Sequence, residues 1–361
     1  MKILITGNMG YVGPSVVKHL RAMYPKATLV GIDIGYFAHC LTNAEIVPEY
    51  CVDVQYFADI RKLPEDLLND VDVVVHLAGI SNDPLGSLNE EVTLDINYKA
   101  SIELAKKAKA SGAKGFVFAS SCSVYGFGDE GARSEKSTVN PLTAHAKSKV
   151  FTESDLEKIA DRNFKVTCLR FATACGMSER LRLDLVLNDF VASATATGKI
   201  AILSDGTAWR PLINIKDMAL AIDWAISRTL QLQASTKEDF LLVNVGSEEW
   251  NYRIKELALA VSKIISGVEI SINKDAQPDK RSYKVNFDLF KKLAPAHQPK
   301  YDLIKTVKEL KEGLDAIGFK DKDFRNSSFI RLKVLHDLKN KGLLSSDFNW
   351  VLPRNMEKTK V

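Results

Sequence analysis

The sequence predicts an α/β fold, a doubly wound parallel sheet with a smaller, discontinuous second lobe. Short apolar runs alternate with helical patterns through the first half of the 361 residues, which predicts parallel strands with helices on both faces. After Gly176 the alternation gives way to a charged insertion and further helical segments. We therefore expect residues 1–176, completed by about 212–247, to form one domain. Residues 177–211 and 248–361 are expected to form the second lobe and a C-terminal helical extension.

The first segment has the pattern of a dinucleotide-binding unit. Residues 2–6 form a short apolar run typical of a buried strand, and a helical pattern follows Gly7, Gly10 and Gly13. Gly7 permits a sharp turn, Gly10 leaves room for a pyrophosphate, and Gly13 lets the helix lie close to the sheet. The N-terminus of that helix then offers backbone N–H groups to the phosphates.

Asp33 indicates which dinucleotide is bound. A second apolar run, residues 27–32, ends on Asp33, twenty residues after Gly13. A carboxylate at this position can accept hydrogen bonds from both adenosine ribose hydroxyls and would repel a 2′-phosphate. No arginine follows closely to offset that repulsion. The segment therefore predicts NAD rather than NADP, bound by a Rossmann-type domain.

The later strands and helices continue this alternation. We expect strands at residues 49–54, 71–77, 115–121, 164–171, 239–246 and 268–272. We expect helices from residue 59, at 90–111, 143–160 and 252–265, in an insertion beginning at 178–184, and in a C-terminal stretch that includes 329–335 and ends in a polar tail. Residues 206–211 are expected to be a turn-rich loop. Ligands bind at the carboxyl ends of parallel strands, so the second lobe is expected to close over that edge.

Three further motifs carry a family resemblance. Residues 76–79 read His-Leu-Ala-Gly, residues 120–126 read Ser-Ser-Cys-Ser-Val-Tyr-Gly, and Lys149 stands four positions after His145 in a predicted helix. Together with the glycine loop, this set resembles the extended short-chain dehydrogenase/reductases that act on nucleotide-linked sugars, the epimerase/dehydratase group. The resemblance extends to about Tyr283 and implies NAD as cofactor and a nucleoside diphosphate-sugar as substrate.

The resemblance also implies which residues form the site. Ser121 matches the catalytic hydroxyl, which hydrogen-bonds the oxygen that becomes a carbonyl, and Lys149 matches the lysine that holds the nicotinamide ribose. The implied catalytic set is Ser121, His145 and Lys149. The implied cofactor-binding set is Gly7, Gly10, Tyr11, Gly13, Asp33, Asp59, Ile60, Leu77, Ala78, Gly79, Asn97 and Lys149. Asn97 is expected to support the active site from within a helix.

His145 is the main departure from the family pattern, which has tyrosine at this position of Y-x-x-x-K. A neutral imidazole, with a reference pKa of about 6.5, can accept a proton at neutral pH. Its ring is shorter than a phenol, however, and Lys149 would disfavour the protonated product. The alternative is that the substitution impairs the enzyme, and both interpretations stay open. Tyr125 belongs to the preceding motif and cannot take the place of the missing tyrosine.

The residues after Ser121 bear on the type of reaction. In 4,6-dehydratases the next two residues are usually Asp and Glu, the acid and base of water elimination. Here they are Cys122 and Ser123, so dehydration is disfavoured. The favoured activity is epimerisation through a transient ketone. Oxidation or reduction at a sugar carbon is the nearest alternative, and a catalytically impaired protein that binds NAD and a nucleotide sugar is the other.

On the substrate side, Arg210 and Arg281 fall where the family places two diphosphate-binding arginines, and guanidinium groups suit phosphate oxygens. Thr173 stands where many relatives carry Asn. The implied substrate-binding set is Ser81, Ser121, Ser123, Thr173, Arg180, Arg182, Asn188, Arg210 and Arg281. The resemblance further implies a homodimer in which helices 90–111 and 143–160 of two copies form a four-helix bundle.

The composition excludes several other classes. Hydrophobic residues make up 46% and charged residues 26%, as in globular proteins, and the net charge of +4 gives no case for nucleic-acid binding. The five cysteines are scattered without a C-x-x-C pair, so no disulfide framework or metal site is expected. The N-terminus enters a strand at once, and no apolar run approaches membrane-spanning length. We expect a cytoplasmic protein.

Overall fold

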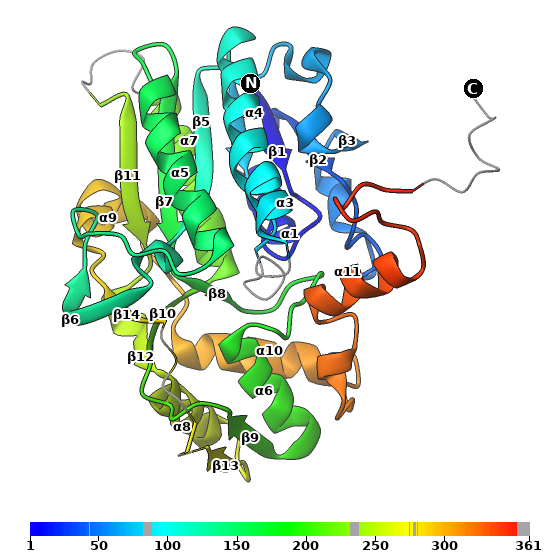
Figure 1. The fold of residues 1–361 in the computed structure, drawn as a ribbon, viewed down its shortest axis with the longest axis vertical. Helices are drawn as coiled ribbons and strands as arrows, with labels where there is room; N and C mark the ends of the chain where they lie inside the picture. Colours follow the sequence, from blue (N-terminus) through cyan, green and yellow to red (C-terminus); the bar gives the residue numbers. More distant parts are fainter. Residues whose placement is uncertain are drawn as a thin grey trace.

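The centre of the molecule is a seven-stranded sheet in which every neighbouring pair of strands is parallel. The computed structural model describes residues 1–42, 44–81, 89–231, 238–273, 275–276, 279 and 281–351 (Figure 1). The strands, in spatial order, are β11 (Phe240–Val245), β7 (Lys165–Phe171), β5 (Gly115–Ser121), β4 (Val73–His76), β1 (Lys2–Thr6), β2 (Thr28–Asp33) and β3 (Val54–Phe57). The predicted fold class is confirmed.

Helices cover both faces of this sheet, because successive side chains of a strand point to opposite sides. Ile3 and Ile5 pack in one apolar cluster with α1 (Gly13–Met23) and α7 (Ile215–Gln231). Leu4 packs on the other face, in a second cluster with α4 (Ala100–Ala110) and α5 (Ala144–Ile159). Burial on both sides explains why these strands appear in the sequence as nearly continuous apolar runs.

The helix that precedes α4 contains an irregular turn. It begins as α3 (Glu90–Leu94), continues as one π-helical segment, Asp95–Lys99, and then becomes α4. The predicted helix over residues 90–111 is therefore confirmed in extent but not in regularity. π-helical turns are rare and are found mostly at functional sites.

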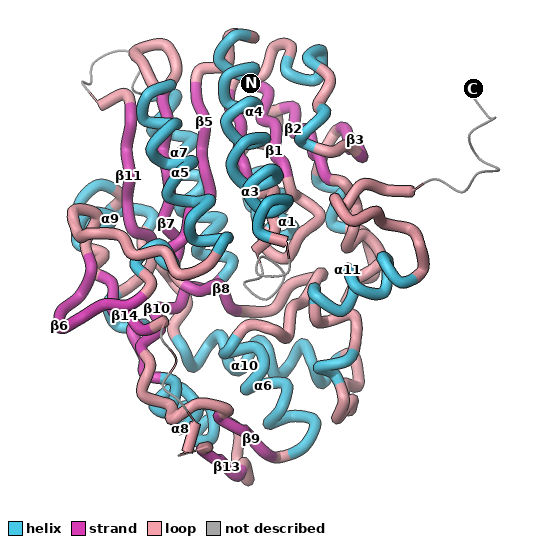
Figure 2. The backbone as a smooth tube through the Cα atoms, viewed as in Figure 1, coloured by secondary structure: helices cyan, strands magenta, loops and turns pink. Residues whose placement is uncertain are grey.

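The second lobe lies beyond the carboxyl ends of the strands (Figure 1). It contains α6 (Val186–Thr197), β9 (Lys199–Ile202), α8 (Ile254–Ile264), β13 (Glu269–Ile272) and α10 (Leu303–Ala316). Between it and the sheet lie β8 (Thr173–Cys175), β10 (Trp209–Asn214) and β12 (Asn251–Arg253), together with β6 (Phe127–Arg133) and β14 (Ser282–Val285). Figure 2 shows α6, α8 and α10 as the helices of this lobe. In the chain, α9 (Asp288–Leu293) precedes α10, and α11 (Arg331–Asn340) follows it.

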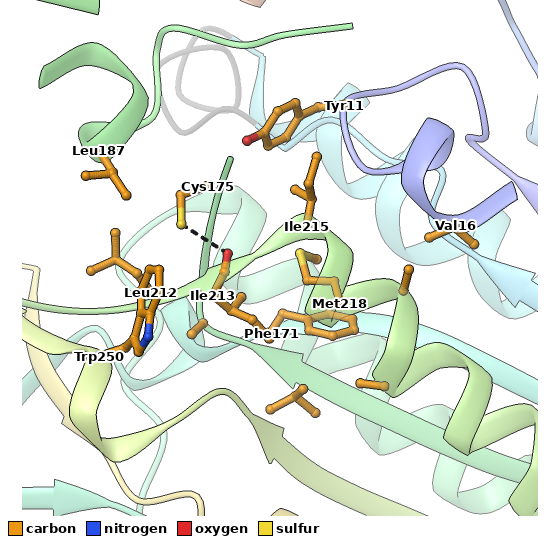
Figure 3. Packing of buried hydrophobic residues seen from close by; sticks show 14 of the residues in the cluster. Tyr11, Val16, Phe171, Cys175, Leu187, Leu212, Ile213, Ile215, Met218 and Trp250 are labelled. Atoms are coloured by element: carbon orange, nitrogen blue, oxygen red, sulfur yellow. Dashed lines mark hydrogen bonds between the residues drawn. The ribbon is translucent and has the colours of Figure 1, made fainter. Parts of the chain in front are cut away.

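One apolar cluster joins the two lobes. Leu187 of α6, Leu212 of β10 and Trp250 belong to the same cluster as Phe171 and Met218, which come from the sheet and from α7; Figure 3 shows part of this cluster. Because this packing is continuous, the boundary near residue 176 does not separate two hydrophobic cores. The domain limits drawn from the sequence stay a prediction.

Several predicted elements differ from the structure. Residues 49–54 do not form a strand: Pro48–Cys51 is a 3₁₀ helix, begun by a proline that suits a first helical position, and β3 starts only at Val54. Residues 178–184 are a loop and not a helix, since their polar side chains bond across the molecule and the helix starts at Val186. Residues 209–211 belong to β10 and pair with β12.

Further 3₁₀ helices in the described part of the chain are Ile60–Lys62, Glu65–Leu68, Cys122–Tyr125, Glu248–Trp250, Pro295–His297 and Phe324–Asn326. Where a helix was predicted to begin at residue 59, the structure has two short 3₁₀ helices, Ile60–Lys62 and Glu65–Leu68. The five cysteines are free and buried. Among the described helices, none combines the length and the apolar character needed to cross a bilayer.

Candidate active site

A cavity of 990 Å³ lies between the carboxyl edge of the sheet and the second lobe. It brings together most of the residues that the sequence singled out. Those in its wall are Gly7, Gly10, Tyr11, Gly13, Asp33, Asp59, Ile60, Leu77, Ala78, Gly79, Ser81, Ser121, Ser123, His145, Lys149, Thr173, Arg182, Arg210 and Arg281. Asn97, Arg180 and Asn188 are buried and do not line it.

The glycine loop has no room for side chains. Gly7 has φ of +74°, and a Cβ there would lie 2.5 Å from the backbone nitrogen of Ala78. A Cβ on Gly13 would lie 2.0 Å from the carbonyl oxygen of Asn8. The loop therefore brings bare backbone to the first turn of α1, where helix geometry leaves N–H groups without intrahelical partners. This arrangement fits a pyrophosphate.

Asp33 ends β2 and is fastened to the same loop. Its Oδ2 accepts a hydrogen bond from the backbone N–H of Met9 at 3.0 Å, and its Oδ1 accepts one from Gly35 at 2.8 Å. Burial raises the pKa of this carboxyl, and the two backbone donors act in the opposite direction. The side chain is thus held in place at the cavity wall, in the position expected for a ribose-binding acid.

His145 is fixed by the backbone of Ile80. Its Nδ1 lies 3.1 Å from the Ile80 carbonyl oxygen. A carbonyl can only accept, so Nδ1 carries the hydrogen, and in the neutral ring Nε2 then carries the lone pair. Asn97, at the π-helical turn, holds Ile80 in turn: its Oδ1 accepts from the Ile80 N–H at 2.7 Å and its Nδ2 donates to the Ile80 carbonyl at 2.9 Å.

Lys149 lies one turn after His145 on α5 and is almost fully buried. Its Nζ donates to the Ala119 carbonyl at 2.7 Å and lies 4.6 Å from the centre of the Phe118 ring. Desolvation lowers the pKa of this lysine to about 8, although Glu153 acts to raise it. The ammonium group is thus held near the end of β5, and Lys149 lines the same cavity as Ser121.

Ser121 and the two residues after it support different roles. The Ser121 Oγ accepts from the backbone N–H of Ser123 at 3.1 Å and so caps the 3₁₀ helix that follows. Cys122 points into the core, where burial raises the pKa of its thiol well above the usual range. The Ser123 Oγ is buried without a hydrogen-bond partner among the described residues. Neither residue has the character of an acid–base pair.

A buried polar network supports this wall, and sequence reasoning missed it. Glu153 forms a bidentate pair with Arg170, with its closer contact at 2.7 Å, and accepts a hydrogen bond from Ser120. Arg170 also donates to the hydroxyl of Tyr125, which donates to Asn244 at 2.7 Å. The position of Glu153, four residues after Lys149, was the available signal. Tyr125 is engaged in this network, as expected of a residue that cannot replace the missing base.

The two predicted phosphate-binding arginines meet at one carboxylate. Arg210 donates to Asp279 at 2.7 Å and also to the carbonyl of Arg281, whose own side chain pairs with Asp279 at 3.1 Å. The arginines hold the pKa of Asp279 below its usual value, although burial opposes them. The acid was overlooked in the sequence, where it stands two positions before Arg281.

Other predicted substrate residues have structural partners. Arg180 forms a buried salt bridge with Glu49 at 2.6 Å, and the Asn188 side chain donates to the hydroxyl of Tyr11 at 2.9 Å. Both lie behind the cavity wall, so they support it and do not face a ligand. Arg182 does reach the wall, where it pairs with Asp184 and donates to Ser81 at 2.9 Å.

Fold and site together define a Rossmann-type dinucleotide-binding protein of the α/β class. The family model described as "NAD dependent epimerase/dehydratase family" matches residues 3–242, and the chain belongs to this family. The resemblance found in the sequence is thereby confirmed, and so is NAD as the cofactor.

Individual relatives are more distant. A UDP-glucose 4-epimerase from Lactobacillus helveticus is 24% identical over 286 residues, which cover 75% of this chain and 83% of that protein. A solved UDP-glucose-4-epimerase from Stenotrophomonas maltophila, with bound NAD and formylated UDP-arabinopyranose, gives a TM-score of 0.74 at 20% identity, with coverage of 88% and 99%. TunA, an NAD-dependent NDP-hexosamine 5,6-dehydratase, gives 0.72 at 21%, with coverage of 89% and 99%. At such identities the solved structures establish the fold.

Proposed function

We propose that this protein epimerises a nucleoside diphosphate-sugar through a transient ketone, with NAD as a resident cofactor. The observation that carries the proposal is the fixed tautomer of His145. Its Nδ1–H is held by Ile80, so the lone pair is on Nε2, and the ring shares its cavity wall with Ser121 and Lys149. A residue that had only lost the family tyrosine would not need its ring oriented in this way.

The chain's own residues have distinct roles in this reaction. The glycine loop and Asp33 would hold the cofactor, which supplies a reversible hydride acceptor when bound. Ser121 would hydrogen-bond the sugar oxygen, and the Nε2 of His145 would take the hydroxyl proton as that oxygen becomes a carbonyl. Lys149, still a cation near neutral pH, would favour the neutral form of the imidazole beforehand. Asn97 is a positioning residue that acts through Ile80.

The substrate's nucleoside diphosphate is assigned to Arg210 and Arg281. Both guanidinium groups line the cavity and converge on Asp279. An incoming diphosphate would take over donors that Asp279 now accepts from. The named relatives include UDP-glucose 4-epimerases, which supports UDP-sugars as the first substrates to test.

Elimination of water is not part of the proposal. The buried Cys122 thiol and the Ser123 hydroxyl stand where that reaction would need an acid and a base, and neither titrates near neutral pH. Epimerisation at one sugar carbon would need no acid–base residue beyond His145 and Ser121.

The test is incubation of the purified protein with UDP-glucose and UDP-galactose separately, followed by chromatography of the nucleotide sugars. Interconversion without net consumption of added NADH is expected. Stoichiometric NADH consumption would indicate a reductase instead. Tight binding of UDP-sugars with no product after prolonged incubation would contradict the proposal and favour a binding protein.

We also propose a homodimer through the α3–α4 and α5 helices. Phe151 is 44% exposed on α5, and its ring packs against Tyr98 at 5.6 Å, which leaves an apolar patch on the outer face of these helices. Sedimentation should give a dimer at micromolar concentration, and Phe151→Asp should give a monomer. A monomeric wild type would contradict the proposed dimer, but it would not contradict the proposed epimerisation.

A further inference from the structure

The C-terminal part of the chain returns to the cofactor side of the molecule. Helix α11 contributes Arg331, Leu332 and Leu335 to the wall of the main cavity. Figure 1 shows α11 and the segment after it beside β2 and β3. The family model ends at residue 242, so this part of the chain lies outside the matched region.

Residues 344–351, here called the C-terminal segment, are attached to the end of β2. The indole N–H of Trp350 donates to the Ile34 carbonyl at 2.7 Å, and its ring lies 5.6 Å from that of Tyr36. The Tyr36 hydroxyl donates to the carbonyl of Phe348, a buried residue with φ of +55°. A bulky residue adopts this left-handed backbone only where its surroundings hold it there. The segment is therefore firmly placed.

Beside this attachment lies a second cavity of 440 Å³. It shares Ile34, Ala58 and Asp59 with the main cavity, so the two meet at the ends of β2 and β3. Its wall includes Phe57, which is 67% exposed, and Trp350, which is 41% exposed. Two large aromatic side chains thus stand partly open to solvent at a cavity that continues from Asp33.

Arg61 connects this cavity to the C-terminal segment. It pairs with Asp59 at 2.6 Å and donates to the Asp347 carbonyl at 2.8 Å and to the Asn349 side chain at 3.3 Å. The Arg61 guanidinium group thereby fixes the position of the C-terminal segment relative to the Asp59 carboxylate in the cavity wall. The side chain is mostly buried, which limits competition from water.

We propose that the C-terminal segment completes the adenine end of the NAD site, with Trp350 as an aromatic wall and Arg61 as the residue that positions it. With the pyrophosphate at the glycine loop and the ribose at Asp33, the base must extend beyond β2, where the second cavity lies. A purine ring matches an aromatic face, and stacking of this kind does not depend on specific hydrogen bonds. The inference rests on NAD binding in the proposed site.

The experiment uses the full chain freed of bound nucleotide and measures dissociation constants by calorimetry. Trp350→Ala should weaken NAD and ADP-ribose by about tenfold, since a base–aromatic stack carries an effect of that order. Nicotinamide mononucleotide and UDP should bind as they do to the wild type, because neither carries adenine. Trp350→Phe should retain most of the NAD affinity.

Phe127→Ala is the matched control, because Phe127 is 50% exposed and lines neither cavity. It should leave NAD affinity unchanged, whereas Arg61→Ala should weaken NAD in the same direction as Trp350→Ala. Wild-type NAD affinity in both Trp350→Ala and Arg61→Ala would overturn the inference while leaving the cofactor assignment in place. Failure of the wild type itself to bind NAD would overturn the cofactor site as a whole.

Discussion

The cofactor half and the substrate half of the cavity are held together in different ways. In the cofactor half, Gly13 and Asp33 are fixed by backbone contacts within the first 35 residues, and Gly7 lies against the backbone of Ala78. In the substrate half, Arg210 and Arg281 are fixed by Asp279, and the Arg281 side chain is 45% exposed. The first half is a rigid backbone frame, and the second is a set of side-chain ion pairs.

This difference indicates where affinity and specificity arise. A rigid frame binds without reordering, so its energy is available for holding NAD throughout a catalytic cycle. Ion pairs between side chains can exchange one anion for another, which suits a substrate that must enter and leave. The predictions that follow test whether each half behaves accordingly.

The largest effect on turnover is expected at His145, which we assign to the cofactor half of the cavity. His145→Ala should lower turnover by roughly a hundredfold or more, the usual contribution of a positioned acid–base group. The wild-type rate should rise with pH as the imidazole loses its proton. It should fall again near pH 8, where Lys149, with its pKa lowered to about 8, loses the charge with which it is expected to hold the nicotinamide ribose. Matched pH–rate profiles measure both limbs.

His145→Tyr separates the two interpretations of this position. If His145 is an adapted base, as we propose, the tyrosine variant should be slower than the wild type, because the Ile80 carbonyl is placed for an imidazole N–H. A faster tyrosine variant would show that the histidine is an impairment. If the rate were the same with His, Tyr or Ala at position 145, the active site would not lie on α5.

The next effect concerns the stability of the same half. His76 joins β1 to α4: its Nδ1 contacts Thr6 at 2.6 Å and its Nε2 contacts Ser101 at 2.7 Å. Burial lowers its pKa to about 3, against about 6.5 unfolded, so the unfolded chain binds the extra proton between these values. The contribution of His76 to the free energy of unfolding is therefore fully present above pH 6.5 and declines as the pH falls.

Between pH 6.5 and pH 5 the free energy of unfolding should fall by about 2 kcal/mol, because each pH unit below the unfolded pKa of His76 costs about 1.4 kcal/mol. Urea unfolding over this range measures it, with His76→Gln as the variant that lacks the titration. The variant will be less stable overall, but its stability should depend less steeply on pH. If the unfolding free energy of the two proteins depended on pH equally steeply, His76 would not be the group responsible for this pH dependence.

On the substrate half, Arg210→Ala should weaken UDP-sugar binding by at least about tenfold, because its side chain is only 11% exposed. Arg281→Ala should act in the same direction and more weakly, since water competes at its exposed side chain. Arg253→Ala is the matched control: this arginine stacks on Trp209, in the same strand as Arg210, and lies outside the cavity wall. Undiminished binding in both cavity variants would place the diphosphate elsewhere.

The smallest effect is a change of preference. The wild type should discriminate strongly against NADP, and Asp33→Ala should bring its affinities for NAD and NADP within a few-fold of each other. The variant also loses the acceptors for Met9 and Gly35, so NAD itself should bind more weakly. Calorimetry with both cofactors measures the ratio, and equal affinities in the wild type would refute the role of Asp33.

The sequence could indicate that Gly7, Gly13 and Asp33 share one cavity wall because its determinants are local. These residues follow one another along a strand, a turn, a helix and the next strand, so their spacing brings them together. The α5 helix likewise fixes Lys149 relative to His145. Where an element is at the edge, the prediction was poorer: β3 carries exposed residues such as Phe57, so no apolar run marks its limits.

Contacts between distant parts of the chain were beyond the reach of pattern analysis. Trp350 meets Ile34 across 316 positions, and Arg180 meets Glu49 across 131. Nothing in the local sequence distinguishes Arg180, buried on a salt bridge, from Arg210, which faces the cavity. The family pattern suggested a diphosphate for Arg210, Arg180 was a further candidate in the insertion, and only tertiary packing separates the two.

The π-helical turn before α4 determines the directions in which the side chains of α4 point. Each residue of an α-helix advances the side-chain direction by about 100°, so one additional residue in a turn rotates the later part of the helix by about that amount. Here the rotation lets Asn97 face Ile80 while the apolar residues of α4 still face the sheet. Deleting one residue between Asp95 and Lys99 would restore a regular helix, yet it would turn either the asparagine or the apolar face away from its partner. We therefore expect this stretch of sequence to be intolerant of length changes, although it lies inside a continuous helical segment.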